Sequence, residues 1–97
     1  MQTATALAHF FAGRNDAAWS WAEAAMRERP NFVTAVCAAA ASGALGGRYA
    51  EAEAAMARLR QLNPGLRLSN LKDQLPLRRP EDFDRWAEGL RKAGLPE

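Results

Sequence analysis

The sequence contains few of the residues from which β-sheets, disulfides and metal sites are built. Isoleucine is absent, two valines and three threonines are the only β-branched residues, and there is one cysteine and one histidine. β-branched side chains favour strands, so their scarcity argues against a sheet. A lone cysteine with no histidine beside it supplies neither a disulfide nor a set of metal ligands. We therefore expect no sheet, no disulfide, no metal, no cofactor and no catalytic residue.

Long apolar runs are also missing. No uninterrupted apolar stretch approaches the roughly 20 residues that a membrane-spanning helix needs. The N-terminus lacks the basic region and leucine-rich segment of a signal peptide. The single Cys37 fits a reducing compartment. We expect a cytoplasmic protein that does not contact the membrane.

Neither sign of charge dominates the chain. The formal net charge is +2, and the basic excess lies at the C-terminal end, where residues 58–97 hold nine Lys and Arg against six Asp and Glu. Mixed charges of this kind are typical of a solvated helical surface rather than a phosphate-binding stripe. Binding of nucleic acid through the basic C-terminal segment is therefore the weakest of the functional hypotheses.

Alanine is what the sequence has in abundance, at 22 of the 97 positions. Alanine has the highest helix propensity because it loses no side-chain rotamers on folding. Glycine and proline divide the chain into helical segments. The pattern predicts helices at 2–12, 16–28, 31–45, 49–62, 69–74 and 80–94.

A tandem repeat organises the first two thirds of the chain. A Gly-Arg turn, a later alanine and a closing proline each recur at one constant spacing (Gly13 and Gly47, Ala18 and Ala52, Pro30 and Pro64). The period is 34, which is the length of the tetratricopeptide (TPR) helix-turn-helix unit. A helical bundle of unrelated topology is the alternative.

We predict a single all-α domain over residues 1–97. Residues 1–30 and 31–64 form two TPR-like antiparallel hairpins stacked as a right-handed superhelix, and residues 65–79 form a leucine-rich capping segment with a short helix. Residues 80–94 form a C-terminal amphipathic helix. Its apolar stripe has helical spacing, at Phe83, Trp86, Ala87 and Leu90.

The C-terminal third carries a more specific resemblance. Residues 63–66, 77–83 and 88–97 read NPGL, LRRPEDF and EGLRKAGLPE. These stretches resemble the C-terminal end of bacterial multidomain proteins that join a class III adenylate/guanylate cyclase domain, or sometimes a winged-helix regulator domain, to TPR units. The resemblance implies that this chain is the last part of a larger signalling protein. It carries over no catalytic residue, so the alternative function is a regulatory fragment of a nucleotide cyclase.

The first helices of TPR units line a concave groove, and here that groove is predicted to be uncharged. Leu7 and Phe10 from the first hairpin and Cys37 and Ala41 from the second are expected to line it. Such a groove suits an amphipathic helix or a leucine-bearing segment. This segment could come from another protein, from a second copy, or from the chain's own leucines between 66 and 77.

Two further features are candidate contacts for a partner. Trp19 and Trp21 are two residues apart on one helix, so they cannot share a face, and an exposed tryptophan is expected to anchor an interaction. The alternative is that both pack against a preceding repeat. Arg78 and Arg79 form a compact basic cluster that either meets an acidic segment or phosphate, or is a solvated linker. The leading hypothesis is a non-catalytic module for protein–protein interaction or self-association, including a homodimer.

Overall fold

The computed structural model describes residues 2–29, 32–67 and 80–95, with the side chains of residues 2 and 3 left aside. These ranges contain five helices and no strand: α1 (Gln2–Phe11), α2 (Asn15–Glu28), α3 (Val33–Leu45), α4 (Tyr49–Leu62) and α6 (Pro80–Ala93). The all-α prediction is confirmed. The helix predicted at 69–74, and the capping segment from residue 68 onward, lie outside the described residues.

The period of the sequence is present in the backbone as well. Gly13 and Gly47 have φ values of 85° and 84°, the left-handed conformation that glycine adopts without steric cost. In both turns the residue after the glycine donates its amide to the carbonyl five residues earlier, at 2.9 and 2.7 Å. This hydrogen bond closes a helix by the Schellman motif. The helices that follow, α2 and α4, have 14 residues each and begin one period apart, at Asn15 and Tyr49.

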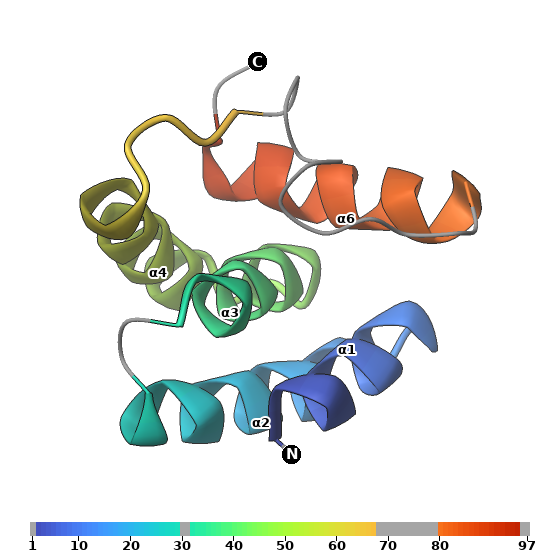
Figure 1. The fold of residues 1–97 in the computed structure, drawn as a ribbon. Helices are drawn as coiled ribbons and strands as arrows, with labels where there is room; N and C mark the ends of the chain where they lie inside the picture. The colour runs from blue at the N-terminus through green and yellow to red at the C-terminus, as the bar shows by residue number, and fades with distance from the viewer. Residues whose placement is uncertain (1, 30–31, 68–79, 96–97) are drawn as a thin grey trace.

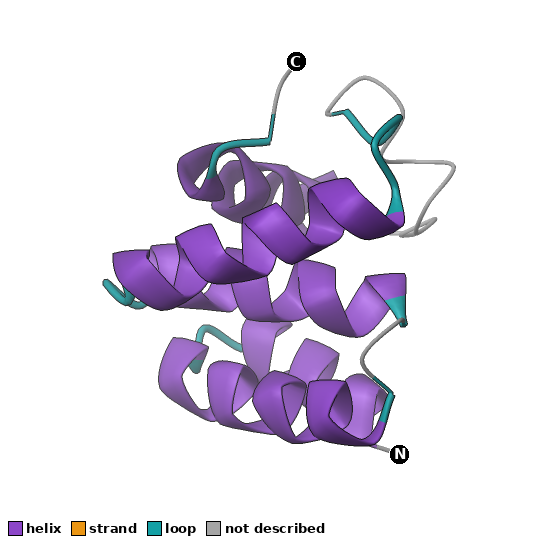
Figure 2. Ribbon diagram, turned by 90° about the vertical axis from the view of Figure 1, so that its left-hand side faces the viewer, coloured by secondary structure: helices purple, strands orange, loops and turns teal. Residues whose placement is uncertain are grey.

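The helices stack in layers, as Figure 1 shows from one side and Figure 2 after a quarter turn. The pair α1 and α2 forms one layer, the pair α3 and α4 forms the next, and α6 lies on the far side of α3 from the first pair. α3 packs against all four of the other described helices. It is therefore the centre of the molecule.

The residues of α3 match this central position. Ten consecutive residues, 35–44, are buried, and all but Val36 and Cys37 are alanine, serine or glycine. A helix that has neighbours on every side must be apolar all round, and small side chains let those neighbours approach closely. The hydroxyl of Ser42 is buried in α3, donates to the carbonyl oxygen of Ala38 at 2.5 Å and so is satisfied.

Candidate functional site

The C-terminal helix α6 docks its predicted apolar stripe on the rest of the chain. Trp86 and Leu90 are fully buried, and Phe83 and Ala87 are partly buried against the same core. This confirms the predicted stripe. Burying Trp86 and Leu90 stabilises the docked helix by roughly 1.5 to 3 kcal/mol each.

Trp86 docks against the last turn of α1. Its ring lies edge-on to Phe10, with ring centroids 5.6 Å apart and planes at 83°, and it is tilted against Phe11 at 6.2 Å. Phe10 and Phe11 are themselves in edge contact, with centroids 5.2 Å apart. Edge-to-face pairs contribute about 0.5 to 1.5 kcal/mol beyond the area they bury. The three rings form one cluster that joins α6 to α1.

At Gly89, α6 lies very close to α3. A Cβ added at Gly89 would lie 2.8 Å from the Cβ of Ala41 and 3.0 Å from its Cα and carbonyl oxygen. Real Cβ atoms almost never come within 2.8 Å of another heavy atom, so any larger residue would push the two helices apart. The pair Gly89 and Ala41 therefore sets the distance between α6 and α3. We call Phe10, Phe11 and Ala41 the α6-binding face.

Two arginines link α6 to neighbouring helices by hydrogen bonds to backbone: Arg85 from within α6, and Arg60 at its C-terminal end. Arg85 donates from Nε to the carbonyl oxygen of Phe10 at 2.9 Å and from Nη2 toward Oδ1 of Asn15 at 3.4 Å. Its positive charge lies at the C-terminus of α1, which is the negative end of the helix dipole. Just past the C-terminal end of α6, Arg60 of α4 donates to the carbonyl oxygen of Gly94 at 3.1 Å. These hydrogen bonds fix the position of α6 along its own axis, in addition to the packing of its apolar stripe.

The open groove expected from the sequence is therefore filled in this structure. Phe10, Cys37 and Ala41 are fully buried, and Leu7 is partly buried against the core. For Phe10 and Ala41 the reason is α6, which covers both. The sequence predicted an uncharged surface suited to an amphipathic helix and left open whether that helix comes from another protein, a second copy or the chain itself. Among the described residues, the segment that covers Phe10 and Ala41 is α6. The predicted leucines from Leu68 onward lie outside the described residues.

Cys37 does not have the chemistry of a reactive thiol. Burial raises the pKa of its thiol from 9.0 to about 12, because the thiolate would lose its hydration. At neutral pH the group is protonated, and the thiol is a weak nucleophile and metal ligand. Over the described ranges, no three His, Cys, Asp or Glu residues cluster as metal ligands would.

The two tryptophans of α2 have different surroundings. Trp19 is half-buried, and the guanidinium of Arg48 lies 4.6 Å from the centroid of its ring. On α3, a Cβ added at Gly43 would lie 3.3 Å from Cδ1 of Trp19. Trp21 is 41% exposed, as expected of one of the two. Trp21 is thus available to a partner. The predicted contacts Arg78 and Arg79 lie outside the described residues.

Two residues that determine the site were missed by the sequence analysis. Arg85 lies outside the apolar stripe that the sequence predicts for its helix, and nothing local indicates that it reaches α1. Gly89 did leave a signal, because a glycine inside an otherwise strong helical pattern costs about 1 kcal/mol relative to alanine and usually has a packing reason. Its partner Ala41 could not be named without the tertiary structure.

In comparisons with known proteins, no family model, no curated protein and no solved structure matches the chain. The TPR and cyclase resemblance therefore stays a prediction. Within the described part of the chain, none of the helices has the length and apolar character needed to cross a bilayer.

Proposed function

We propose that this chain is a non-catalytic protein–protein interaction module whose α6-binding face accepts an amphipathic helix. The observation that carries the proposal is the fit of α6 itself. A fully buried Trp86 against two phenylalanines, and a glycine against Ala41, are how an amphipathic helix is recognised by a complementary apolar surface. In this chain that helix is supplied in cis.

The covalent connection explains how α6 would regulate access by other helices. Twelve residues separate Arg67 from Pro80, so α6 is never far from its binding face. A tether of this length corresponds to an effective concentration on the order of 1 mM. A partner helix of equal intrinsic affinity, about 10 µM, would bind roughly 100-fold more weakly while α6 is docked.

A peptide-binding experiment tests this function. The full chain carrying Gly89→Leu should release α6, because the added side chain has no space against Ala41. A fluorescent peptide with the native sequence of residues 80–95 should then bind in trans and raise the anisotropy. The native chain should bind it at least about tenfold more weakly.

Matched controls make the result specific. Lys92→Leu adds the same side chain at an exposed position of α6, so this chain should behave like the native one. A peptide carrying Trp86→Ala should lose at least tenfold in affinity for the Gly89→Leu chain. A Gly89→Leu chain that retains native helicity by circular dichroism yet ignores the native peptide would contradict the proposal. If that chain unfolds, Trp86→Ala in the full chain opens the same face for the same measurement.

The parent protein is a second part of the proposal. We place the module at the C-terminal, regulatory end of a larger bacterial signalling protein, and the support for this is the resemblance of residues 63–66, 77–83 and 88–97. Sequencing the gene upstream of this segment tests it. A cyclase or winged-helix domain in the same reading frame would support the assignment, and a stop codon directly upstream of Met1 would oppose it.

A further inference from the structure

Two arginines on different helices make the same kind of contact where α6 docks. Arg85 of α6 donates to the carbonyl oxygen of Phe10, in the last turn of α1. Arg60 of α4 donates to the carbonyl oxygen of Gly94, directly after the last turn of α6. Both guanidinium groups therefore lie at the C-terminal end of a helix, where the helix dipole is negative. Each contact depends on the direction of a helix and not only on its apolar stripe.

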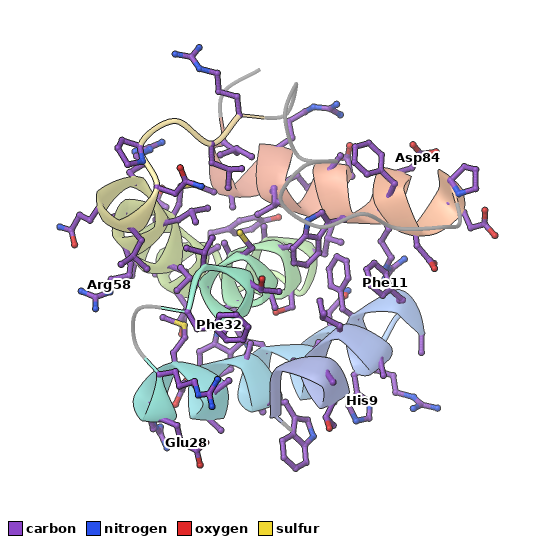
Figure 3. All side chains as sticks on the ribbon, viewed as in Figure 1. His9, Phe11, Glu28, Phe32, Arg58 and Asp84 are labelled. Atoms are coloured by element: carbon purple, nitrogen blue, oxygen red, sulfur yellow. The ribbon has the colours of Figure 1, made fainter. Side chains whose placement is uncertain are left out.

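The guanidinium of Arg85 contacts three groups at the junction of α1 and α2. Its Nε donates to the carbonyl oxygen of Phe10 at 2.9 Å, its Nη2 donates toward Oδ1 of Asn15 at 3.4 Å, and its Cζ lies 5.6 Å from the centroid of the Phe10 ring. Figure 3 shows Phe11 between the end of α1 and α6, and Asp84 on the side of α6 away from α1. Arginine fits this place because its planar group donates several hydrogen bonds and also stacks on aromatic rings.

The C-terminal end of α6 has a defined geometry of its own. Gly94 has a φ value of 112°, and Leu95 donates its amide to the carbonyl oxygen of Leu90 at 3.0 Å. Leu95 is then buried against the core. These features form a Schellman motif with its hydrophobic contact. The carbonyl oxygen of Gly94 lies outside the hydrogen bonds of the helix and is the group that Arg60 binds.

The contacts of the two arginines lie on opposite sides of Gly89, where α6 packs on Ala41. At about 1.5 Å per residue, Arg85 and Trp86 lie roughly 4.5 to 6 Å from Gly89 toward the N-terminus of α6, and Gly94 lies roughly 7.5 Å from it toward the C-terminus. Figure 1 shows the N-terminal part of α6 over the end of α1 and its C-terminal end on the side of α4. The two ends of α6 therefore meet different helices.

A helix laid on Ala41 in the opposite direction would lose the contacts at both ends. Its arginine and tryptophan would lie on the side of α4, away from the carbonyl oxygen of Phe10. Arg60 would meet the middle of the helix, where the carbonyl groups already accept hydrogen bonds within the helix. Hydrophobic contact is non-directional, so the apolar stripe alone would bind in either direction. The hydrogen bonds at the two ends are what distinguish one direction from the other.

We propose that the α6-binding face accepts a helix in one direction only, and that the helix it selects carries Arg-Trp-x-x-Gly-Leu and ends at a glycine followed by a leucine. In α6 and the residue after its end, these are residues 85–90 and 94–95. The inference rests on the proposed function and adds the chemistry of the partner. A partner must bring a basic residue four positions before the glycine that packs on Ala41, although the face itself is uncharged.

Variant peptides measure the selection by sequence. The full chain carrying Gly89→Leu is the receptor, and the probe is an amidated, fluorescent peptide of residues 80–95. Arg85→Gln in the peptide should weaken binding at least about fivefold, because the carbonyl oxygen of Phe10 loses a charged donor. Lys92→Gln makes the same substitution at an exposed position and should change the affinity by less than about twofold. Arg60→Gln in the receptor should weaken the native peptide about two- to threefold, because this contact is exposed.

A second measurement reports the direction of the bound helix. Gln61→Cys in the receptor places a dye beside Arg60 at an exposed position, and Cys37 does not compete for the dye because it is buried. A short-range quencher at the C-terminus of the native peptide should quench this dye. The same quencher at the N-terminus, roughly 20 Å away along the helix, should quench at least about threefold less.

The outcomes separate this inference from the proposed function. Equal affinities of the native and Arg85→Gln peptides, or equal quenching from the two ends, would overturn the selection while leaving helix binding established. A receptor that keeps native helicity and ignores the native peptide would overturn both proposals. If Gly89→Leu unfolds the chain, Trp86→Ala in the full chain serves as the receptor for the same peptides, with the same expectations.

Discussion

The helices α1 and α3 occupy corresponding places in the 34-residue period of the sequence, but their surroundings differ. Both end at a glycine turn, and each is followed by a helix of 14 residues. Yet residues 35–44 of α3 are all buried, whereas α1 has exposed positions on one side and fully buried ones, such as Phe10, on the other. The local backbone of a unit is set by its own sequence, and its burial is set by its neighbours.

Because α3 is buried and one side of α1 is exposed, the same substitution should lower the stability of the chain far more on α3 than on α1. Ala38→Glu should destabilise the chain by at least about 3 kcal/mol, because a carboxyl group would be buried without a partner. Ala4→Glu, at the equivalent position of α1, should change the free energy of unfolding by no more than about 0.5 kcal/mol. Urea denaturation at low protein concentration, where a dimer contributes little, measures both. Equal effects of the two substitutions would contradict the interior position of α3.

The pH dependence of stability tests the interior character of α3 by a second route. The pKa of Cys37 is about 12 in the folded chain, against 9.0 ordinarily. Below pH 9 the thiol is protonated in both states and contributes no pH dependence. Between pH 9 and 12 the unfolded chain ionises while the folded chain keeps its proton, so stability should fall with rising pH by up to about 1.4 kcal/mol per unit.

Cys37→Ala isolates this contribution from the other groups that titrate at alkaline pH. The difference in unfolding free energy between the native chain and the variant should be constant from pH 7 to about pH 9, and should then change in favour of the variant. Urea denaturation at a series of pH values provides both curves. Parallel curves up to about pH 11 would mean that Cys37 is accessible to water.

The smallest difference between two corresponding substitutions is expected at the two glycine turns, where Gly13 and Gly47 have nearly the same φ. Gly13→Ala and Gly47→Ala should each cost about 1 to 2 kcal/mol, because a Cβ is strained at positive φ. A Cβ would meet nothing within 4 Å at Gly47 and only Arg85 at 3.6 Å at Gly13, so the backbone term dominates in both. Thermal or urea unfolding should give values within about 0.5 kcal/mol of each other. A clearly larger cost at Gly13 would instead indicate that the turn supports Arg85 and the docking of α6.

Most of the local structure followed from the sequence. The alanine content, the Gly-Arg turns and the proline positions predicted the described helices to within one or two residues at their ends, because these signals act on the chain next to them. The apolar stripe of α6 was predicted for the same reason, since it depends only on helical periodicity. The exposure of one of the two tryptophans followed from their spacing alone.

The candidate site was only half predictable. Leu7, Phe10 and Ala41 were expected to line an apolar groove for a helix, but the sequence could not show that α6 covers Phe10 and Ala41. Arg85 bonds to a carbonyl group 75 positions away in the chain. Such contacts depend on the path of the whole backbone, which no pattern within a short window of sequence contains.

The sequence by itself determined that this protein is helical, where its turns lie, that a 34-residue period runs through its first two thirds, and that its last helix has one apolar side. Only the tertiary structure decided where that side docks and which copy of the repeated helix lies in the interior. The physical reason is that hydrophobic burial is non-directional and accepts any apolar surface. Selection among such surfaces comes from shape, here Gly89 against Ala41 and Trp86 against Phe10 and Phe11.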